Sequence, residues 1–332
     1  MQGSISQVAA VARAQSTNKL LQWDAGKFDG YSSKAMTGPH RLQEMDLFND
    51  HVLVDLLDNY PRNRLQAWTM GTDLCHREDW KPVDTAGVSG KDLLAAVKTG
   101  RLWYNIVRLD LFDRQYREVI DRLYAEMAAD CPRFKPVSAF GTLLLSSPNA
   151  LVYYHADGPP TTLFHLRGHK KMWVYPAGDR RFVSQFFMEE IYGSAMDEEV
   201  PYSPEFDNHA DVFDLTPGTA LWWPHNAPHR IENSGTFNVS LSTRYQTEES
   251  ERRKLVYNAN RFFRRKVGVK SLSVTETGLV PSVKCLTYRL CRRAGLDQNP
   301  PGYIYKTNLR VDPTAQLGYS VMPEMKKTPF SH

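Results

Sequence analysis

The most informative segment of this chain reads Tyr153-Tyr154-His155-Ala156-Asp157-Gly158-Pro159-Pro160, an apolar strand that ends in a Gly-Pro turn. Side chains two residues apart in a strand face the same side, so His155 and Asp157 can point inward together. Two histidines and one carboxylate hold a non-haem Fe(II) on one face and leave the other positions open for substrate and O2. The segment therefore predicts two of three ligands of a metal site.

A second segment, Trp223-Pro224-His225-Asn226-Ala227-Pro228-His229, supplies candidates for the third ligand. His225 and His229 both lie in or just after this proline-containing loop, and local spacing alone leaves the choice between them open.

Short apolar runs surround both segments, and glycine or proline turns separate them, as is typical of a β-sandwich or barrel. Strands are expected at residues 138–146, 149–156, 161–167, 170–175, 211–215, 219–223 and 236–245. An insertion at residues 178–207 carries a predicted helix at 182–192. Insertions over a barrel mouth often contact the substrate or act as a lid.

Residues 138–246, about a third of the chain, resemble the Jumonji-C-like branch of the cupin superfamily, which consists of 2-oxoglutarate-dependent oxygenases with a double-stranded β-helix core. The resemblance makes His155 and Asp157 the family's H-x-D pair. It also favours His229 as the distal ligand, because that residue follows the strand Pro217-Gly218-Thr219-Ala220-Leu221-Trp222-Trp223-Pro224 and a short loop.

The resemblance also implies a site for 2-oxoglutarate. Lys170, in the turn Arg167-Gly168-His169-Lys170, matches the lysine that pairs with the far carboxylate of this co-substrate. Arg244, on the last strand, is the alternative, since a guanidinium can grip a carboxylate with two hydrogen bonds. Thr161 is a candidate for bonding the metal-proximal carboxylate. Val152 stands where some family members carry a threonine for that purpose.

The strand and helix patterns predict a mainly β core with flanking α-helices at both ends, and the resemblance implies that this core is a double-stranded β-helix of cupin or jelly-roll type. Four regions are expected: a flexible lead at 1–38, an α/β extension packing on the core at 39–137, the catalytic core at 138–246, and a helical basic region with an extended tail at 247–332. Helices are expected near 49–61, 89–100 and 113–129, and again at 248–266 and 279–294.

Composition narrows the class of protein. An apolar content of 42% suits a buried core, and no apolar run approaches the 18 or so residues of a membrane span. The first 18 residues lack the apolar stretch of a signal peptide. The four cysteines are scattered, which favours reduced thiols in the cytoplasm over a zinc site or disulfide framework.

Positive charge is concentrated near the C-terminus, although the net charge is only +4. Residues 252–293 hold twelve lysines or arginines against one acid, Glu276. We expect a solvated helix face, while nucleic acid, an acidic partner or lipid headgroups are alternatives for such a run. Nucleic acid is possible but not favoured, because no recognised nucleic-acid motif accompanies the run.

The candidate ligands and the resemblance together imply an Fe(II)- and 2-oxoglutarate-dependent oxygenase that uses O2 to hydroxylate a protein side chain or a small metabolite, with a modified nucleobase also compatible. No catalytic side chain beyond the metal site is assigned, no membrane partner is expected, and no oligomeric state is predicted. Two alternatives stay open: a cupin-type metalloenzyme that does not use 2-oxoglutarate, and a non-catalytic cupin-like binding or regulatory protein.

Overall fold

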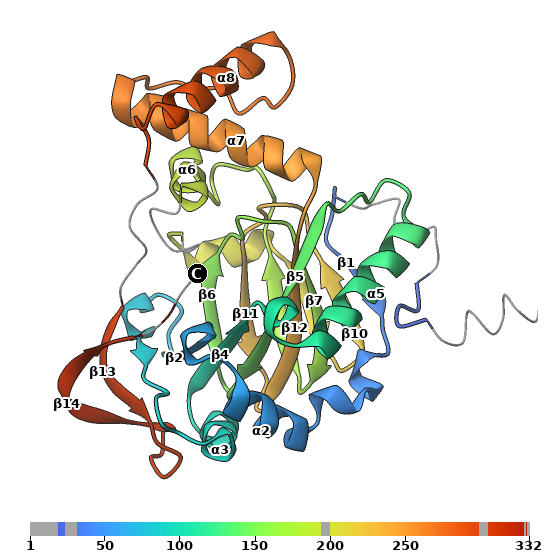
Figure 1. Cartoon of the computed structure of the whole chain (residues 1–332), viewed down its shortest axis with the longest axis vertical. Helices are drawn as coiled ribbons and strands as arrows, with labels where there is room; N and C mark the ends of the chain where they lie inside the picture. The colour runs from blue at the N-terminus through green and yellow to red at the C-terminus, as the bar shows by residue number, and fades with distance from the viewer. Residues whose placement is uncertain (1–18, 24–31, 194–199, 299–304, 329, 331–332) are drawn as a thin grey trace, which may run out of the picture.

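The computed structural model describes residues 19–23, 32–193, 200–298, 305–328 and 330 of the chain. Its centre is a pair of antiparallel sheets (Figure 1). The larger sheet has the strand order β1-β10-β7-β12-β5-β4-β2-β3, and the smaller has the order β6-β11-β8-β9. The strands of the larger sheet are β1 (Met36–Pro39), β2 (Leu65–Thr69), β3 (Pro82–Val83), β4 (Leu102–Val107), β5 (Ser138–Ser146), β7 (Thr161–Arg167), β10 (Thr219–Trp222) and β12 (Asn238–Gln246). Those of the smaller sheet are β6 (Leu151–His155), β8 (Lys170–Val174), β9 (Asp211–Leu215) and β11 (His229–Asn233).

The chain crosses repeatedly between the two sheets. From β5 to β12, consecutive strands lie in different sheets except for β8 and β9, which are neighbours in the smaller one. Apolar side chains of both sheets meet in one cluster, including Leu163 of β7, Met172 of β8 and Leu221 of β10. The next residue of β7, Phe164, packs into a different cluster, as the two-residue period of a strand requires.

Helices flank the sheets. They are α2 (Asp50–Asn59), α3 (Gly90–Thr99), α4 (Leu109–Phe112), α5 (Arg114–Asp130), α6 (Gln185–Tyr192), α7 (Glu248–Phe262) and α8 (Leu279–Arg293). Helix α5 lies against the larger sheet, where Gly141 of β5 leaves room for the side chain of Ile120 (Figure 1). The Asp113 carboxylate caps α5 by accepting from the backbone N–H of Gln115. Among the helices that the structure describes, none is both long and apolar enough to span a lipid bilayer.

All seven strands predicted for the core are confirmed, and so is the helix of the insertion, which runs as Gln185–Tyr192. Strand β11 was not predicted, although it begins at His229. The predicted C-terminal tail also differs, because β13 (Lys306–Val311) and β14 (Tyr319–Lys327) form a hairpin. Backbone hydrogen bonds of 2.8 and 3.0 Å between Asp84 and the β13 residues Leu309 and Val311 tie this hairpin to the chain next to β3.

The prediction of a flexible lead at 1–38 is wrong for residues 19–23 and for residues 36–38, which belong to β1 and pair with β10. Leu20, Leu21 and Trp23 are buried in the main apolar cluster, and the Trp23 ring lies 4.6 Å from that of Trp222. The rest of the lead before Ser32 lies outside the described residues. The other domain boundaries stay predictions.

The basic run at 252–293 is only partly the solvated face that was expected. Arg253 lies 2.6 Å from Glu276, and Arg264 lies 2.7 Å from Glu189, a fully buried carboxylate of α6. Arg261 and Arg265 both pair with Glu190 of the same helix. Arg261 of α7, together with Arg264 and Arg265 of the π-helical turn that follows it (Phe263–Val267), therefore ties this segment to α6 (Figure 1).

The turn between β7 and β8 yields a prediction about stability. Gly168 has a φ of +84°, and a Cβ at this position would collide with the carbonyl oxygen of Phe237. Gly168→Ala should therefore lower the free energy of unfolding by more than the roughly 1–2 kcal/mol of left-handed strain alone. Gly178→Ala is the matched control, because Gly178 has a φ of +75° with no atom within 4 Å of an added Cβ. Urea unfolding that gives equal losses for both variants would contradict the role of the Phe237 contact.

Candidate metal centre

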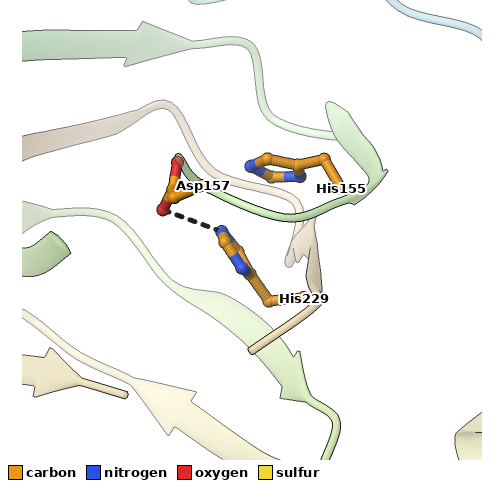
Figure 2. Close-up of side chains that lie close together, drawn as sticks. All are labelled: His155, Asp157 and His229. Atoms are coloured by element: carbon orange, nitrogen blue, oxygen red, sulfur yellow. Dashed lines mark ion pairs between the residues drawn. The ribbon is translucent and has the colours of Figure 1, made fainter. Parts of the chain in front are cut away.

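The pairing of β6 with β11 brings two of the predicted ligands together. His155 is the last residue of β6, His229 is the first of β11, and the two are direct partners in the antiparallel register. Asp157 follows β6 by two residues. The ligand atoms of His155, Asp157 and His229 all lie within 4.8 Å of one another, and the three side chains point toward a common centre (Figure 2).

Hydrogen bonds to the backbone orient both imidazoles. Nδ1 of His155 lies 2.8 Å from the carbonyl oxygen of Tyr153, and Nδ1 of His229 lies 3.1 Å from that of Ala227. A carbonyl oxygen only accepts, so each Nδ1 carries the proton and each Nε2 keeps its lone pair for a metal. Nε2 of His229 lies 3.6 Å from Oδ2 of Asp157. This donor set fits Fe(II) and similar divalent ions.

The structure turns His225 away from this cluster. Its Nε2 lies 2.7 Å from the carbonyl oxygen of Gly158 and 3.0 Å from the hydroxyl of Tyr192. Burial lowers the pKa of His225 to about 4, so the ring is neutral and donates through Nε2. Of the two candidates for the distal ligand, His229 alone joins His155 and Asp157.

Lys170, the first residue of β8, lies between the two sheets. Only 2% of the residue is exposed, and its Nζ has no hydrogen-bond partner among the described residues. The Nζ lies over the Trp103 ring, 5.8 Å from its centroid. Burial lowers the pKa of Lys170 to about 7. A buried ammonium without an anion is costly, so the position suits a ligand that brings a negative charge.

His165 lines the same region, although the sequence did not single it out as a site residue. Its Nε2 donates to the carbonyl oxygen of Gly168 at 2.9 Å, and its Nδ1 accepts from the hydroxyl of Ser240 at 3.0 Å. Burial, reinforced by the charge of Lys170, lowers the pKa of His165 to about 3. The neutral His165 ring therefore stabilises the β7–β8 turn that precedes Lys170.

The two other predicted co-substrate residues lie nearer to the metal ligands. Nη2 of Arg244 donates to Oδ1 of Asp157 at 2.9 Å. Thr161 is buried opposite Arg244 in the β7–β12 register, and its hydroxyl donates to the carbonyl oxygen of Pro159 at 3.2 Å. Arg244 thus engages the candidate metal ligand itself.

Asn226 was missed by sequence reasoning. Its side-chain amide donates to the carbonyl oxygen of Asp157 at 2.7 Å and to that of Gly158 at 3.2 Å. Its φ is +64°, a conformation that asparagine tolerates better than most residues. The only sequence feature that could have indicated this role is the position of Asn226 between Pro224-His225 and Pro228-His229.

No family model and no curated protein matches the chain. Solved structures of YcfD from Escherichia coli are similar at 12% identity and a TM-score of 0.49, covering 81% of this chain and 67% of that one. One of them is described as YcfD, a ribosomal oxygenase, in complex with cobalt and 2-oxoglutarate; its identity is 11%, its TM-score is 0.45, and the match covers 84% of this chain and 68% of that one. The dimethylsulfoniopropionate (DMSP) lyase DddQ from Ruegeria pomeroyi matches at 12% identity and a TM-score of 0.22, covering 34% of this chain and 40% of that one. The chain spans about two thirds of the length of YcfD. At such identities, function must be judged from the residues of the site itself.

Metal binding can be tested ligand by ligand. His155→Ala, Asp157→Ala and His229→Ala should each abolish binding of Mn(II), an air-stable substitute for Fe(II), because each removes one of three donors. His225→Ala is the comparison variant and should keep one metal per chain, because it removes a backbone contact to Gly158 and not a donor. Calorimetric titration with Mn(II) measures the affinity and the number of ions bound per chain for each variant. Loss of binding in His225→Ala with retention in His229→Ala would transfer the distal role to His225.

Burial of Lys170 predicts a pH dependence of stability in protein free of metal and co-substrate. The folded-state pKa is about 7 against an ordinary value of 10.5, so between these values the unfolded chain binds more protons. The free energy of unfolding should therefore rise with pH across that window. Lys170→Met should stabilise the empty protein at pH 7 by a few kcal/mol, with the gain shrinking toward pH 10.

Lys171→Met is the control for that experiment, because Lys171 is exposed on the same strand. Its effect should stay within about 0.5 kcal/mol at every pH. A Lys170→Met variant that is less stable than wild type at pH 7, as measured by chemical unfolding, would show that the ammonium has a stabilising partner.

Proposed function

We propose that the chain is an Fe(II)- and 2-oxoglutarate-dependent oxygenase of the hydroxylating type. The observation that carries this proposal is the buried ammonium of Lys170, which has no hydrogen-bond partner within the described part of the chain and lies inside the same two-sheet core as a cluster of two histidines and one carboxylate. A metal ligand set alone fits many chemistries. A second, cationic subsite within that core fits a co-substrate with a carboxylate at each end.

The strand order supports a double-stranded β-helix as the finer description of the core. Eight successive strands divide into β5-β12-β7-β10 within the larger sheet and β6-β11-β8-β9 as the smaller one. Strands β4, β2 and β3 then extend the larger sheet beyond β5. In this arrangement the candidate ligands lie at one end of the smaller sheet, at the end of β6 and the start of β11.

The strand register supports the proposal that Lys170 reaches a ligand extending from the metal site. In the β8–β11 register, Val174 lies opposite His229 and Lys170 opposite Asn233. Four residues of strand separate the two positions, about 13 Å along β8. A flexible lysine side chain and a five-carbon dicarboxylate together can bridge that gap. We therefore assign the far carboxylate of 2-oxoglutarate to Lys170. Arg244 instead keeps its hydrogen bond to Asp157.

In the proposed reaction, Fe(II) with 2-oxoglutarate and O2 supplies the oxidising chemistry, which yields succinate, CO2 and a hydroxylated substrate. His155, Asp157 and His229 would hold the iron, and Thr161 would bond the metal-proximal carboxylate. Arg244 donates to the Asp157 carboxylate and so holds one of its oxygens in place. The primary substrate is proposed to be a protein side chain or a small metabolite.

A cupin-type metalloenzyme without 2-oxoglutarate is the second candidate. The observation that favours it is Val152, a buried apolar side chain where the resemblance implies a hydroxyl in some family members. The two candidates differ in one product, since only the first makes succinate.

Substitution of Lys170 separates the two candidates. With Fe(II) and O2, wild type should form succinate from 2-oxoglutarate, and Lys170→Ala should weaken co-substrate binding by roughly 2–5 kcal/mol while iron stays bound. Lys170→Arg should restore binding only in part, because a planar guanidinium does not replace a point-charge ammonium. NMR quantification of succinate against 2-oxoglutarate concentration measures the effect.

Arg244→Ala is the comparison variant. Because Arg244 bonds Asp157, its loss should weaken metal binding more than co-substrate binding. A larger loss of 2-oxoglutarate affinity in Arg244→Ala than in Lys170→Ala would reverse the assignment. Absence of succinate in wild type with every substrate tried would favour the second candidate.

A further inference from the structure

The loop between β10 and β11 binds the loop that carries Asp157. Asn226 donates through its amide to the carbonyl oxygens of Asp157 and Gly158, at 2.7 and 3.2 Å. His225 adds a third bond to the same backbone, from Nε2 to the carbonyl oxygen of Gly158 at 2.7 Å. One short loop therefore fixes the main chain at and just after a candidate metal ligand.

The backbone of Asn226 is as specific as its side chain. A φ of +64° places it in the left-handed region, which favours glycine, asparagine and aspartate. Of these three, asparagine alone offers both an amide N–H donor and a carbonyl acceptor. The position therefore favours asparagine, whose side chain can donate one hydrogen bond and accept another.

The side-chain oxygen of Asn226 accepts a hydrogen bond from the insertion at residues 178–207. Tyr192, the last residue of α6, donates its hydroxyl to Oδ1 of Asn226 at 3.0 Å and lies 3.0 Å from Nε2 of His225. The Tyr192 ring stacks on Tyr257 of α7, with centroids 5.2 Å apart. A continuous set of hydrogen bonds therefore runs from α6 through Asn226 to the backbone of Asp157.

Ion pairs tie α6 to α7 and to the π-helical turn Phe263–Val267 that follows it. Glu189 is fully buried and receives hydrogen bonds of 2.7 and 3.0 Å from Arg264. Glu190 is 4% exposed and pairs with Arg261 at 3.3 Å and with Arg265. Buried charges that lose their partners are costly, so these ion pairs favour the docked position of α6.

We propose that Asn226 is a positioning residue for Asp157 and that Tyr192 couples the docking of α6 to metal binding at that carboxylate. The inference rests on the proposed metal site. Neither residue touches the metal; Asn226 fixes the backbone from which the carboxylate projects, and Tyr192 fixes Asn226. Outer partners of this kind are worth about 10- to 100-fold in metal affinity.

Coupling of this kind is reciprocal. If docked α6 strengthens metal binding, a bound metal must strengthen the docking of α6 by the same factor. The backbone amides of α6 should therefore exchange more slowly with solvent when the metal is bound. A loop that is merely part of the scaffold would not transmit this effect to α6.

The test compares Mn(II) affinity and amide hydrogen exchange in the full chain. Tyr192→Phe removes only the hydroxyl, and Asn226→Gly keeps the left-handed backbone while removing the amide. Asn226→Asp is a second variant that also tolerates this backbone but lacks the amide donor. Tyr257→Phe is the matched control, since it sits in the same aromatic stack and its hydroxyl is outside the Tyr192–Asn226–Asp157 bonds.

Asn226→Gly and Asn226→Asp should each weaken Mn(II) binding by roughly 10- to 100-fold, and Tyr192→Phe by a smaller factor. Mn(II) should slow exchange in α6 of wild type and Tyr257→Phe, and this slowing should be lost in Tyr192→Phe. Wild type that binds no Mn(II) would overturn the proposed metal site. Wild type that binds Mn(II), with the folded Tyr192 and Asn226 variants matching it in affinity and exchange, would overturn the coupling alone.

Discussion

The antiparallel pairing of β6 with β11 is the constraint on which the site depends. It places His229 directly opposite His155, and the chain after β6 then returns Asp157 to the same point. Side chains alternate along a strand, so a slip of one residue would turn His229 to the other face. The register is held by β8, which pairs with β11 on its other edge, and by the loop contacts of Asn226 and His225.

Several features near the site cost stability. Lys170 is a buried ammonium without a described partner, and Asn226 takes a left-handed backbone conformation. Such features persist only where surrounding structure enforces them, and they gather at functional sites. Here Lys170 lies in the core between the two sheets, and Asn226 lies in the loop that bonds the backbone of Asp157. The apolar cluster between the two sheets stabilises the fold and offsets the cost of these features.

The sequence predicted what local patterns determine. The H-x-D pair follows from the two-residue period of a strand, and the seven confirmed strands follow from apolar runs between turns. Strand β11 was not predicted because its sequence, His229-Arg230-Ile231-Glu232-Asn233, is mostly polar. Arg230 is nevertheless buried, since it stacks on Trp173 and pairs with Asp207. Long-range partners also explain the burial of Leu21 and Trp23, the pairing of Arg264 with Glu189, and the role of Asn226. None of these partners is adjacent in sequence, so no local pattern reveals them.

We propose that a metal and 2-oxoglutarate share the space between the candidate triad and Lys170. A crystal structure of the protein prepared anaerobically with Fe(II) and 2-oxoglutarate tests this most directly. We expect iron on His155, Asp157 and His229, the keto-acid end of 2-oxoglutarate on the iron, and its far carboxylate on Lys170. Iron at another set of residues, or a far carboxylate held away from Lys170, would contradict the account.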